Sequence, residues 1–257
     1  EYFLVVNAAN TDKDFKWMID NKKDFNIVLE NISDQIGIIA LQGPESERIL
    51  KKLTDTDLSK IKPFHFDRNV KISGTEYLVS RTGYTGEDGF EVYAPVENVV
   101  QVWNDILEAG KEYGIKPAGL GCRDTLRFEA GMPLYGNEIS RDVSPLEGGL
   151  KFFVKLDKKE DFIGKEALNK SWSEGLKRKV IGFEMKGRGI PRHDYEVYKD
   201  GKKIGYVTTG YMSPTLKKNI GVALIEADEA KIGNEIDIMI RKKPVKAVTI
   251  NKRFYKR

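Results

Sequence analysis

The chain has very few of the residues that bind metals or form cross-links. Among its 257 residues there are one cysteine, Cys122, and two histidines, His65 and His193. A single cysteine excludes an internal disulfide framework and fits a reducing compartment. So few thiol and imidazole groups also argue against a zinc site, and we expect no metal.

Long apolar runs and a strong charge are missing as well. No apolar segment is long enough to cross a bilayer, and no signal-peptide pattern is visible, so we expect a cytoplasmic protein without a membrane partner. The net charge of +4 is mild, whereas nucleic-acid binders usually carry a dense basic stripe. We therefore expect no nucleic-acid partner. The composition, 40% hydrophobic and 32% charged, predicts a folded globular chain.

The chain begins in an unusual way, with EYFLVVNAAN and no methionine. Phe3–Val6 have the pattern of a buried strand, and we expect a strand at 2–7. A strand without neighbours leaves its backbone groups unpaired, so natural domains seldom begin inside one. We therefore expect this chain to be the C-terminal piece of a longer protein. Asn10 or Thr11 is expected to cap the helix that follows.

Three stretches of the chain differ in their pattern of expected strands and helices, which predicts an α+β fold with three domains. Residues 1–40 show a strand, a helix and two strands around a turn at 31–35, and are interpreted as the C-terminal remainder of an α+β domain whose beginning is missing. Residues 41–170 alternate strands and helices, with a hairpin turn at Ser73-Gly74 and a strongly amphipathic helix beginning near Val96. They form the predicted central α+β domain.

From about Arg178 onward only short strands and turns follow, which predicts a C-terminal β-barrel or jelly-roll domain at 171–257. Asp200-Gly201 is a strong hairpin signal within it. Basic residues gather in this third of the chain, and they are interpreted either as a solvated face or as a docking surface for an acidic partner. They are Lys177, Arg178, Lys179, Arg241, Lys242, Lys243 and Arg253.

A glycine-rich stretch, SRTGYTGEDGFEVY at 80–93, has glycine at every third position, and Glu91 then opens an alternating strand pattern. The stretch leads into a strand, whereas a dinucleotide-binding motif leaves a strand and opens a helix. No phosphate-binding Gly-Lys-Ser/Thr follows it, and no nucleophile elbow is present.

Four residues beside glycines or other small residues are candidates for a binding site: Asn7, Tyr84, Glu91 and Arg123. Singly, each has an ordinary explanation as a turn, surface or capping residue. Together they supply an amide, a phenol, a carboxylate and a guanidinium at places where a ligand can approach closely. A carboxylate accepts two hydrogen bonds from an N–H/NH2 edge, and an arginine grips a carboxylate. The set suits a flat heteroaromatic ligand with a distant anionic group.

Seven segments in a fixed order carry a resemblance over the whole chain. They are VVNAAN, LQGPES, SRTGYTGEDGFE, AGLGCRDTLRFEAGMPLYG, PLEGGL, FIGKEAL and SPTLKKNIGVAL. Together they closely resemble the T-protein family of the glycine cleavage system, the tetrahydrofolate-dependent aminomethyltransferases. The resemblance implies a multi-domain cloverleaf around a central folate channel, with tetrahydrofolate as co-substrate. It also implies a lipoylated H-protein partner, whose dihydrolipoyl arm delivers an aminomethyl group and from which ammonia is released.

The resemblance also implies roles for the four candidates. Glu91 would bind the amino-pyrimidine edge of the pterin, Tyr84 would line the same pocket, and Asn7 would contact the folate. Arg123 would bind toward the tail carboxylates. The family's catalytic aspartate lies in a GGxxDD-like strand of its N-terminal region, and no such motif occurs among these residues, so the catalytic residue is unassigned.

Three other interpretations stay open at this point. One is the folate-binding half of a dimethylglycine or sarcosine dehydrogenase, which would carry a flavin domain upstream. Another is a non-catalytic folate-binding relative that assists iron–sulfur assembly, whose Lys-Gly-Cys-Tyr signature is missing here because Cys122 lies in GLGCRD. The third is a basic β-rich RNA-binding protein, which would place aromatic residues among lysines on one sheet.

Overall fold

A computed structural model describes residues 1–255, which form two compact units. Unit 1 comprises Glu1–Gly83 and Glu87–Pro117, and unit 2 comprises Tyr84–Gly86 and the chain from Ala118 onward. Each unit has its own hydrophobic core. Helices and antiparallel sheets in one chain, with a barrel at its C-terminal end, confirm the predicted α+β class. The division into three domains stays a prediction.

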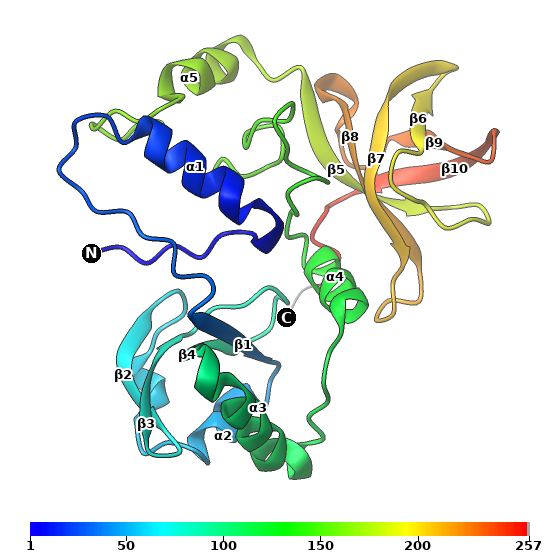
Figure 1. The fold of residues 1–257 in the computed structure, drawn as a ribbon. Coiled ribbons are helices and arrows are strands. Elements are labelled where there is room, and N and C mark those ends of the chain that lie inside the picture. The colour runs from blue at the N-terminus through cyan, green and yellow to red at the C-terminus, as the bar shows by residue number, and fades with distance from the viewer. Residues whose placement is uncertain (256–257) are drawn as a thin grey trace. The chain divides into compact units, whose positions relative to one another are not determined.

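Unit 1 is built on a four-stranded antiparallel sheet of order β1-β4-β3-β2 (Figure 1). The strands are β1 (Ile36–Gln42), β2 (Phe66–Ile72), β3 (Thr75–Ser80) and β4 (Gly89–Pro95). The predicted hairpin turn joins β2 to β3, and both of its residues, Ser73 and Gly74, have positive φ angles of 48° and 92°. Two positive φ angles match the twist of the flanking strands.

The helices α2 (Ser46–Lys51) and α3 (Val96–Gly110) pack on this sheet. The predicted amphipathic helix is confirmed as α3, whose Val102 and Ile106 are buried in the core with Phe90 and Val92 of β4. Short 3-10 helices occur at η1 (Ala8–Asn10), η2 (Leu58–Lys60) and η3 (Lys111–Tyr113).

The N-terminal part of unit 1 corrects two sequence predictions. The helix is present as α1 (Thr11–Asn21), but the predicted strand at 2–7 is wrong, and so is the first of the two strands expected around the turn at 31–35. A strand needs a neighbour to complete its hydrogen bonds, and none lies beside either segment in the described part of the chain. Phe3 instead packs edge-on against Tyr93, with ring centroids 5.4 Å apart.

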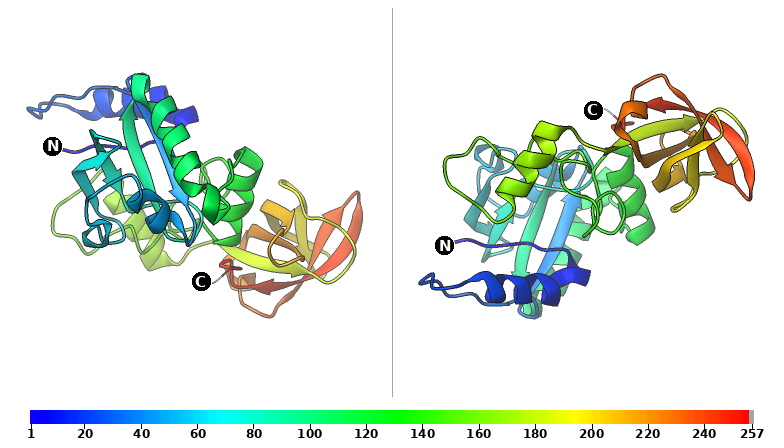
Figure 2. Two further views of the ribbon diagram at one scale, coloured as in Figure 1. Left: turned by 90° about the horizontal axis from the view of Figure 1, so that it is seen from below. Right: turned by 90° about the horizontal axis from the view of Figure 1, so that it is seen from above.

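The second half of unit 2 is a closed six-stranded antiparallel barrel of order β10-β5-β8-β7-β6-β9, which confirms the predicted C-terminal barrel (Figure 2). Its strands are β5 (Arg178–Met185), β6 (Glu196–Lys199), β7 (Lys202–Met212), β8 (Asn219–Glu226), β9 (Glu235–Ile240) and β10 (Lys243–Ile250). A short 3-10 helix, η4 (Ala227–Glu229), follows β8. Asp200 and Gly201 form the predicted turn between β6 and β7, with φ angles of 50° and 79°.

Two helices precede the barrel in unit 2, α4 (Leu120–Glu129) and α5 (Lys165–Glu174). The buried Phe128 of α4 shares a core with Val222 and Leu224 of β8. This packing fixes the C-terminal half of α4 on the barrel, while its first turn carries exposed side chains. No helix within residues 1–255 is long and apolar enough to cross a membrane.

Candidate functional site

Glu91 lies on β4 among three hydroxyl groups. The strand register places it opposite Ser80 of β3 and Ala40 of β1. Its Oε2 atom accepts hydrogen bonds from Thr82 Oγ1 and, at 3.3 Å, from the Tyr93 hydroxyl. Ser80 Oγ continues the cluster, 2.5 Å from Thr82 Oγ1. We call Ser80, Thr82 and Tyr93 the hydroxyl cluster.

The hydroxyl cluster leaves one side of the Glu91 carboxylate open. Every hydrogen bond that Glu91 accepts from residues 1–255 reaches Oε2, and within that range it takes part in no ion pair. Burial of Tyr93 raises the pKa of its hydroxyl, and the nearby Glu91 charge adds to the rise, so this hydroxyl stays a protonated donor at neutral pH. Oε1 therefore keeps its capacity to accept hydrogen bonds from a ligand.

The loop before β4 is anchored at both ends by Arg81. Its Nε donates to Asp88 Oδ1 at 2.9 Å, its Nη2 also bonds to Asp88, and Nη2 lies 2.6 Å from Glu47 Oε2. The guanidinium also covers the Phe90 ring, 5.1 Å from its centroid. A bidentate pair of this kind restricts the loop because both partners are held in one geometry.

Two of the three loop glycines make room for Gln42. A Cβ atom at Gly83 would lie 1.8 Å from Gln42 Oε1, and one at Gly89 would lie 2.4 Å from Gln42 Nε2. Gln42 Nε2 donates to the Thr82 carbonyl at 3.1 Å. Glycine is therefore explained at both positions, because the Gln42 side chain approaches the backbone closely there, near the start of β4.

Tyr84 and Arg123 meet in unit 2. The Arg123 guanidinium carbon lies 4.7 Å from the centroid of the Tyr84 ring, a cation–π contact. The Tyr84 hydroxyl donates to the carbonyl of Pro133. Burial raises the pKa of this hydroxyl, so it remains a donor at neutral pH. The third loop glycine, Gly86, has a φ of 80°, and a Cβ atom there would lie 2.8 Å from the Ala130 Cβ.

Asn7 is exposed and works as a cap. Its Oδ1 accepts a hydrogen bond of 3.1 Å from the backbone N–H of Ala9 at the start of η1. Of the four predicted site residues, the structure therefore brings Tyr84 and Arg123 into contact, whereas Glu91 and Asn7 bond to separate sets of residues in unit 1. The ligand-binding roles of all four stay predictions.

Several residues next to the predicted site were not found from the sequence. Thr82 lies in the quoted loop, and a hydroxyl two residues after Ser80 could have indicated the hydroxyl cluster. Near Arg123, the buried Arg127 bonds to Asp124 and Glu138. The four-residue spacing of the two arginines places them on one side of α4, which was an available signal.

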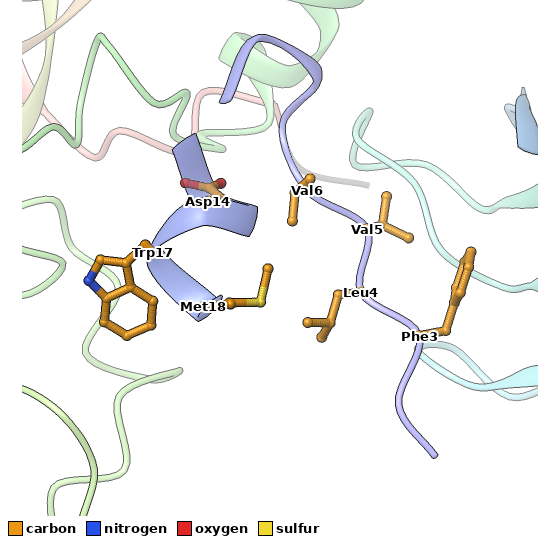
Figure 3. A pocket seen from close by; sticks show the side chains of 7 residues that line it. All are labelled: Phe3, Leu4, Val5, Val6, Asp14, Trp17 and Met18. Atoms are coloured by element: carbon orange, nitrogen blue, oxygen red, sulfur yellow. The ribbon is translucent and has the colours of Figure 1, made fainter. Parts of the chain in front are cut away.

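A hollow of about 330 Å³ lies elsewhere in unit 1, between the N-terminal segment and α1 (Figure 3). Phe3, Leu4, Val5, Val6, Asp14, Trp17 and Met18 line it. The lining is apolar except for Asp14, and none of the predicted site residues takes part. Across residues 1–255 no group of three acidic, histidine or cysteine side chains is placed to hold a metal ion.

Comparisons with known proteins agree over the whole chain. Residues 1–158 match the family model of the GCVT N-terminal domain, and residues 178–256 match that of the glycine cleavage T-protein C-terminal barrel domain. The chain is 64% identical to an aminomethyltransferase of Caldanaerobacter subterraneus subsp. tengcongensis, over 100% of this chain and 68% of the relative. It is 58% identical to an aminomethyltransferase of Alkaliphilus metalliredigens, over 100% of this chain and 69% of that protein.

A solved structure is similar as well. The crystal structure of the glycine cleavage system aminomethyltransferase T from Bartonella henselae superposes with a TM-score of 0.84 at 26% identity. The match covers 97% of this chain and 67% of that one. The chain thus spans about two thirds of the length of these relatives.

Proposed function

This chain belongs to the glycine cleavage T-protein family of aminomethyltransferases, and we propose which group it transfers and to which acceptor. It moves the one-carbon unit from the aminomethyl-dihydrolipoyl arm of a lipoylated H-protein to tetrahydrofolate, and ammonia is released. The relatives that are 58–64% identical over the whole chain are aminomethyltransferases, so the dehydrogenase and non-catalytic interpretations are not favoured.

The observation that carries the proposal is the half-open carboxylate of Glu91. A pterin presents an N–H and an NH2 group along one edge, and a carboxylate accepts both in a charge-assisted pair. The hydroxyl cluster holds Oε2, while Oε1 is open. A carboxylate held by neutral hydroxyls rather than by a cation can bind a ligand without breaking an ion pair.

Arg123 and Tyr84 supply the second part of the proposal. The Tyr84 ring supports one face of the guanidinium, and this leaves the edge with its N–H donors available for a carboxylate. We assign Arg123 to the tail carboxylates of the folate and Tyr84 to the pocket wall. Asn7 is assigned a folate contact. All four residues bind in this proposal, and none is given the chemical step. No residue is proposed as a metal ligand.

The direct test uses the complete protein with tetrahydrofolate and H-protein loaded with the aminomethyl group. Calorimetry should detect tetrahydrofolate binding, and the assay should detect methylenetetrahydrofolate and ammonia in equal amounts. Binding without turnover would support a non-catalytic folate module instead. The absence of both would overturn the proposal.

We place the docking of H-protein, acidic in this family, on the turn between β9 and β10. Arg241 and Lys242 form this turn with φ angles of 46° and 66°, which ordinary residues adopt at a cost. Both side chains are exposed, as is Lys243, and none of the three is in an ion pair with residues 1–255. Arg178, by contrast, bonds to Glu147 at 2.9 Å. The turn therefore offers free positive charge.

Charge reversal tests this docking site. Arg241→Glu with Lys242→Glu should lower the association rate with H-protein about tenfold and flatten its dependence on salt, because rim charges steer association. Lys231→Glu, an exposed charge elsewhere on the same unit, is the control. The double reversal changes the net charge by four units and the control by two, so a control effect about half as large on the logarithm of the rate would show that only net charge matters. A cytoplasmic location is also proposed, supported by the single exposed cysteine.

A further inference from the structure

The first turn of α4 carries Arg123 but has little local support. The helix begins after Gly119, which makes no side-chain capping bond, and no acidic residue stands in the first turn. Gly119 and Gly121 have no neighbour within 4 Å of a would-be Cβ atom, so nothing packs against them. Gly121 weakens the first turn because glycine loses more backbone freedom than other residues, and Gly119 at the N-cap position offers no side-chain acceptor to the first N–H groups. Some other contact must keep this turn in place.

Asp124 supplies such a contact through the strand β7. Its Oδ2 accepts a hydrogen bond from the Tyr211 hydroxyl, and its Oδ1 accepts one of 2.7 Å from Arg127 Nε. The Tyr211 ring is itself fixed edge-on against Phe128, with centroids 5.5 Å apart. The residue directly after Arg123 is therefore tied to the barrel by Tyr211 and to the buried half of its own helix by Arg127.

Arg127 continues the connection into the core. Only 1% of its surface is exposed, and its Nη1 bonds to Glu138 Oε2 at 2.9 Å and to the Met132 carbonyl at 3.1 Å. Glu138 in turn accepts hydrogen bonds from the hydroxyls of Thr208 and Thr209 on β7, at 2.8 and 2.6 Å. A fully bonded buried network has one arrangement, because any other would leave charges unpaired.

We propose that Tyr211, with the Asp124–Arg127 pair, is a positioning residue that fixes the first turn of α4 and so holds Arg123 for its ligand. Arg123 is exposed, and its ring contact with Tyr84 does not fix the helix that carries it. The tether to β7 replaces the missing cap. This inference takes its ligand from the proposed function. The ordering of the first turn of α4, by contrast, can be measured without any ligand.

The first arm of the test measures that order without any ligand. Cys122 is this chain's single cysteine, is exposed, and immediately precedes Arg123, so a nitroxide attached to it reports the motion of the first turn. Tyr211→Phe removes only the hydroxyl that reaches Asp124 and should narrow the spectrum of the label. Tyr198→Phe is the matched control, because its hydroxyl also donates to a carboxylate of the same barrel, Glu196, at 3.2 Å. It should leave the spectrum unchanged.

The second arm measures tetrahydrofolate affinity in the complete protein. Tyr211→Phe should weaken binding about three- to tenfold, the range for one lost hydrogen bond, while the melting temperature falls by only a few degrees and the protein stays folded. In a protein that already carries Arg123→Ala, the same change should have no further effect, because the tether acts through Arg123. Asp124→Asn is a second variant with the same expected pattern.

The outcomes separate the two proposals. A label spectrum that is the same in Tyr211→Phe and the parent protein overturns the positioning role, and so does an affinity loss that is simply additive with Arg123→Ala. If the parent protein fails to bind tetrahydrofolate, the proposed function fails, while the spectrum of the label still decides whether Tyr211 orders the turn.

Discussion

Glu91 of unit 1 and Glu138 of unit 2 are both glutamates, but their carboxylates differ in burial and in hydrogen bonding. Glu138 is buried, with 3% of its surface exposed, and its two oxygens accept from Arg127, Thr208, Thr209 and the Leu134 N–H. Glu91 is partly exposed and bonds only through Oε2, to hydroxyls. One carboxylate has all its partners inside the protein, and the other has an open oxygen.

We therefore assign the fully bonded carboxylate of Glu138 to the stability of the fold, and we propose the half-open carboxylate of Glu91 for a ligand. The buried carboxylate of Glu138 is assigned to folding, because without its charge the buried Arg127 keeps only the partly exposed Asp124 as an ion-pair partner. A carboxylate held by neutral donors has no cation to release, so an incoming ligand can bind it without breaking an ion pair.

The largest effect is expected for Glu138→Gln. The amide would place a donor against the donors of Arg127, Thr208 or Thr209, and we expect the free energy of unfolding to fall by about 3–5 kcal/mol. Urea unfolding measures it, with Glu196→Gln as the control, since Glu196 is an exposed partner of Lys203 on the same unit. A loss below about 1 kcal/mol would show that the buried network is not required for folding.

Glu91→Gln should leave stability almost unchanged but weaken tetrahydrofolate binding. One charge-assisted acceptor becomes a donor that faces a donor of the pterin, which costs about 2–4 kcal/mol, or roughly thirty- to a thousandfold in affinity. Calorimetry on the complete protein measures it, beside Glu76→Gln on the exposed part of β3. If stability falls and affinity does not, Glu91 belongs with Glu138.

Thr82→Val tests whether the hydroxyl cluster orients Glu91. The substitution preserves the shape of the side chain and removes the donor to Oε2, so affinity should fall by about 1 kcal/mol, near fivefold. Thr75→Val, at the exposed start of β3, is the control. An unaltered affinity would mean that Tyr93 alone is sufficient to hold the carboxylate.

The smallest expected effect concerns a buried cation, the side-chain amine of Lys252. Lys252 lies 3.4 Å from the Gly131 carbonyl and 3.5 Å from the Gly148 carbonyl, and burial lowers the pKa of its amine. Between the folded and the ordinary pKa the unfolded chain holds more protons, so stability should rise with pH there. The slope stays below about 1.4 kcal/mol per pH unit, the limit for one proton.

Lys252→Met should remove that part of the slope, which ends near the ordinary lysine pKa of about 10. Urea unfolding of both proteins across this range is the measurement, and the difference between them isolates Lys252 from the other lysines. Parallel curves would mean that the amine is as well solvated when folded as when unfolded.

Local patterns predicted the elements whose signals are local. The turns at Ser73-Gly74 and Asp200-Gly201 and the apolar face of α3 all follow from neighbouring residues, and all are confirmed. The strand expected at 2–7 failed because a strand depends on a partner that the pattern itself cannot supply. The short helix α5 was not predicted.

The candidate site also combines residues that local patterns indicate with contacts that they do not. Glu91, Tyr84 and Arg123 could be chosen from residue type and glycine neighbours. The close approach of Gln42 to Gly83 and Gly89 joins two strands far apart in sequence, and no local pattern indicates it. Likewise Arg127 appears in the sequence as an ordinary helix residue, and only the contact with Glu138 and Thr209 explains its burial.

The closure of the barrel has a consequence for amide hydrogen exchange. With β9 paired to β10 and β10 to β5, each strand has a neighbour on both sides, so most of its N–H groups are bonded and should exchange only when the barrel opens. In the sheet of unit 1, β4 is the one strand among residues 1–255 that pairs with β1, and alternate N–H groups along β1 point away from it. Mass spectrometry after brief exposure to heavy water should therefore find partial labelling along β1 while the barrel strands remain unlabelled.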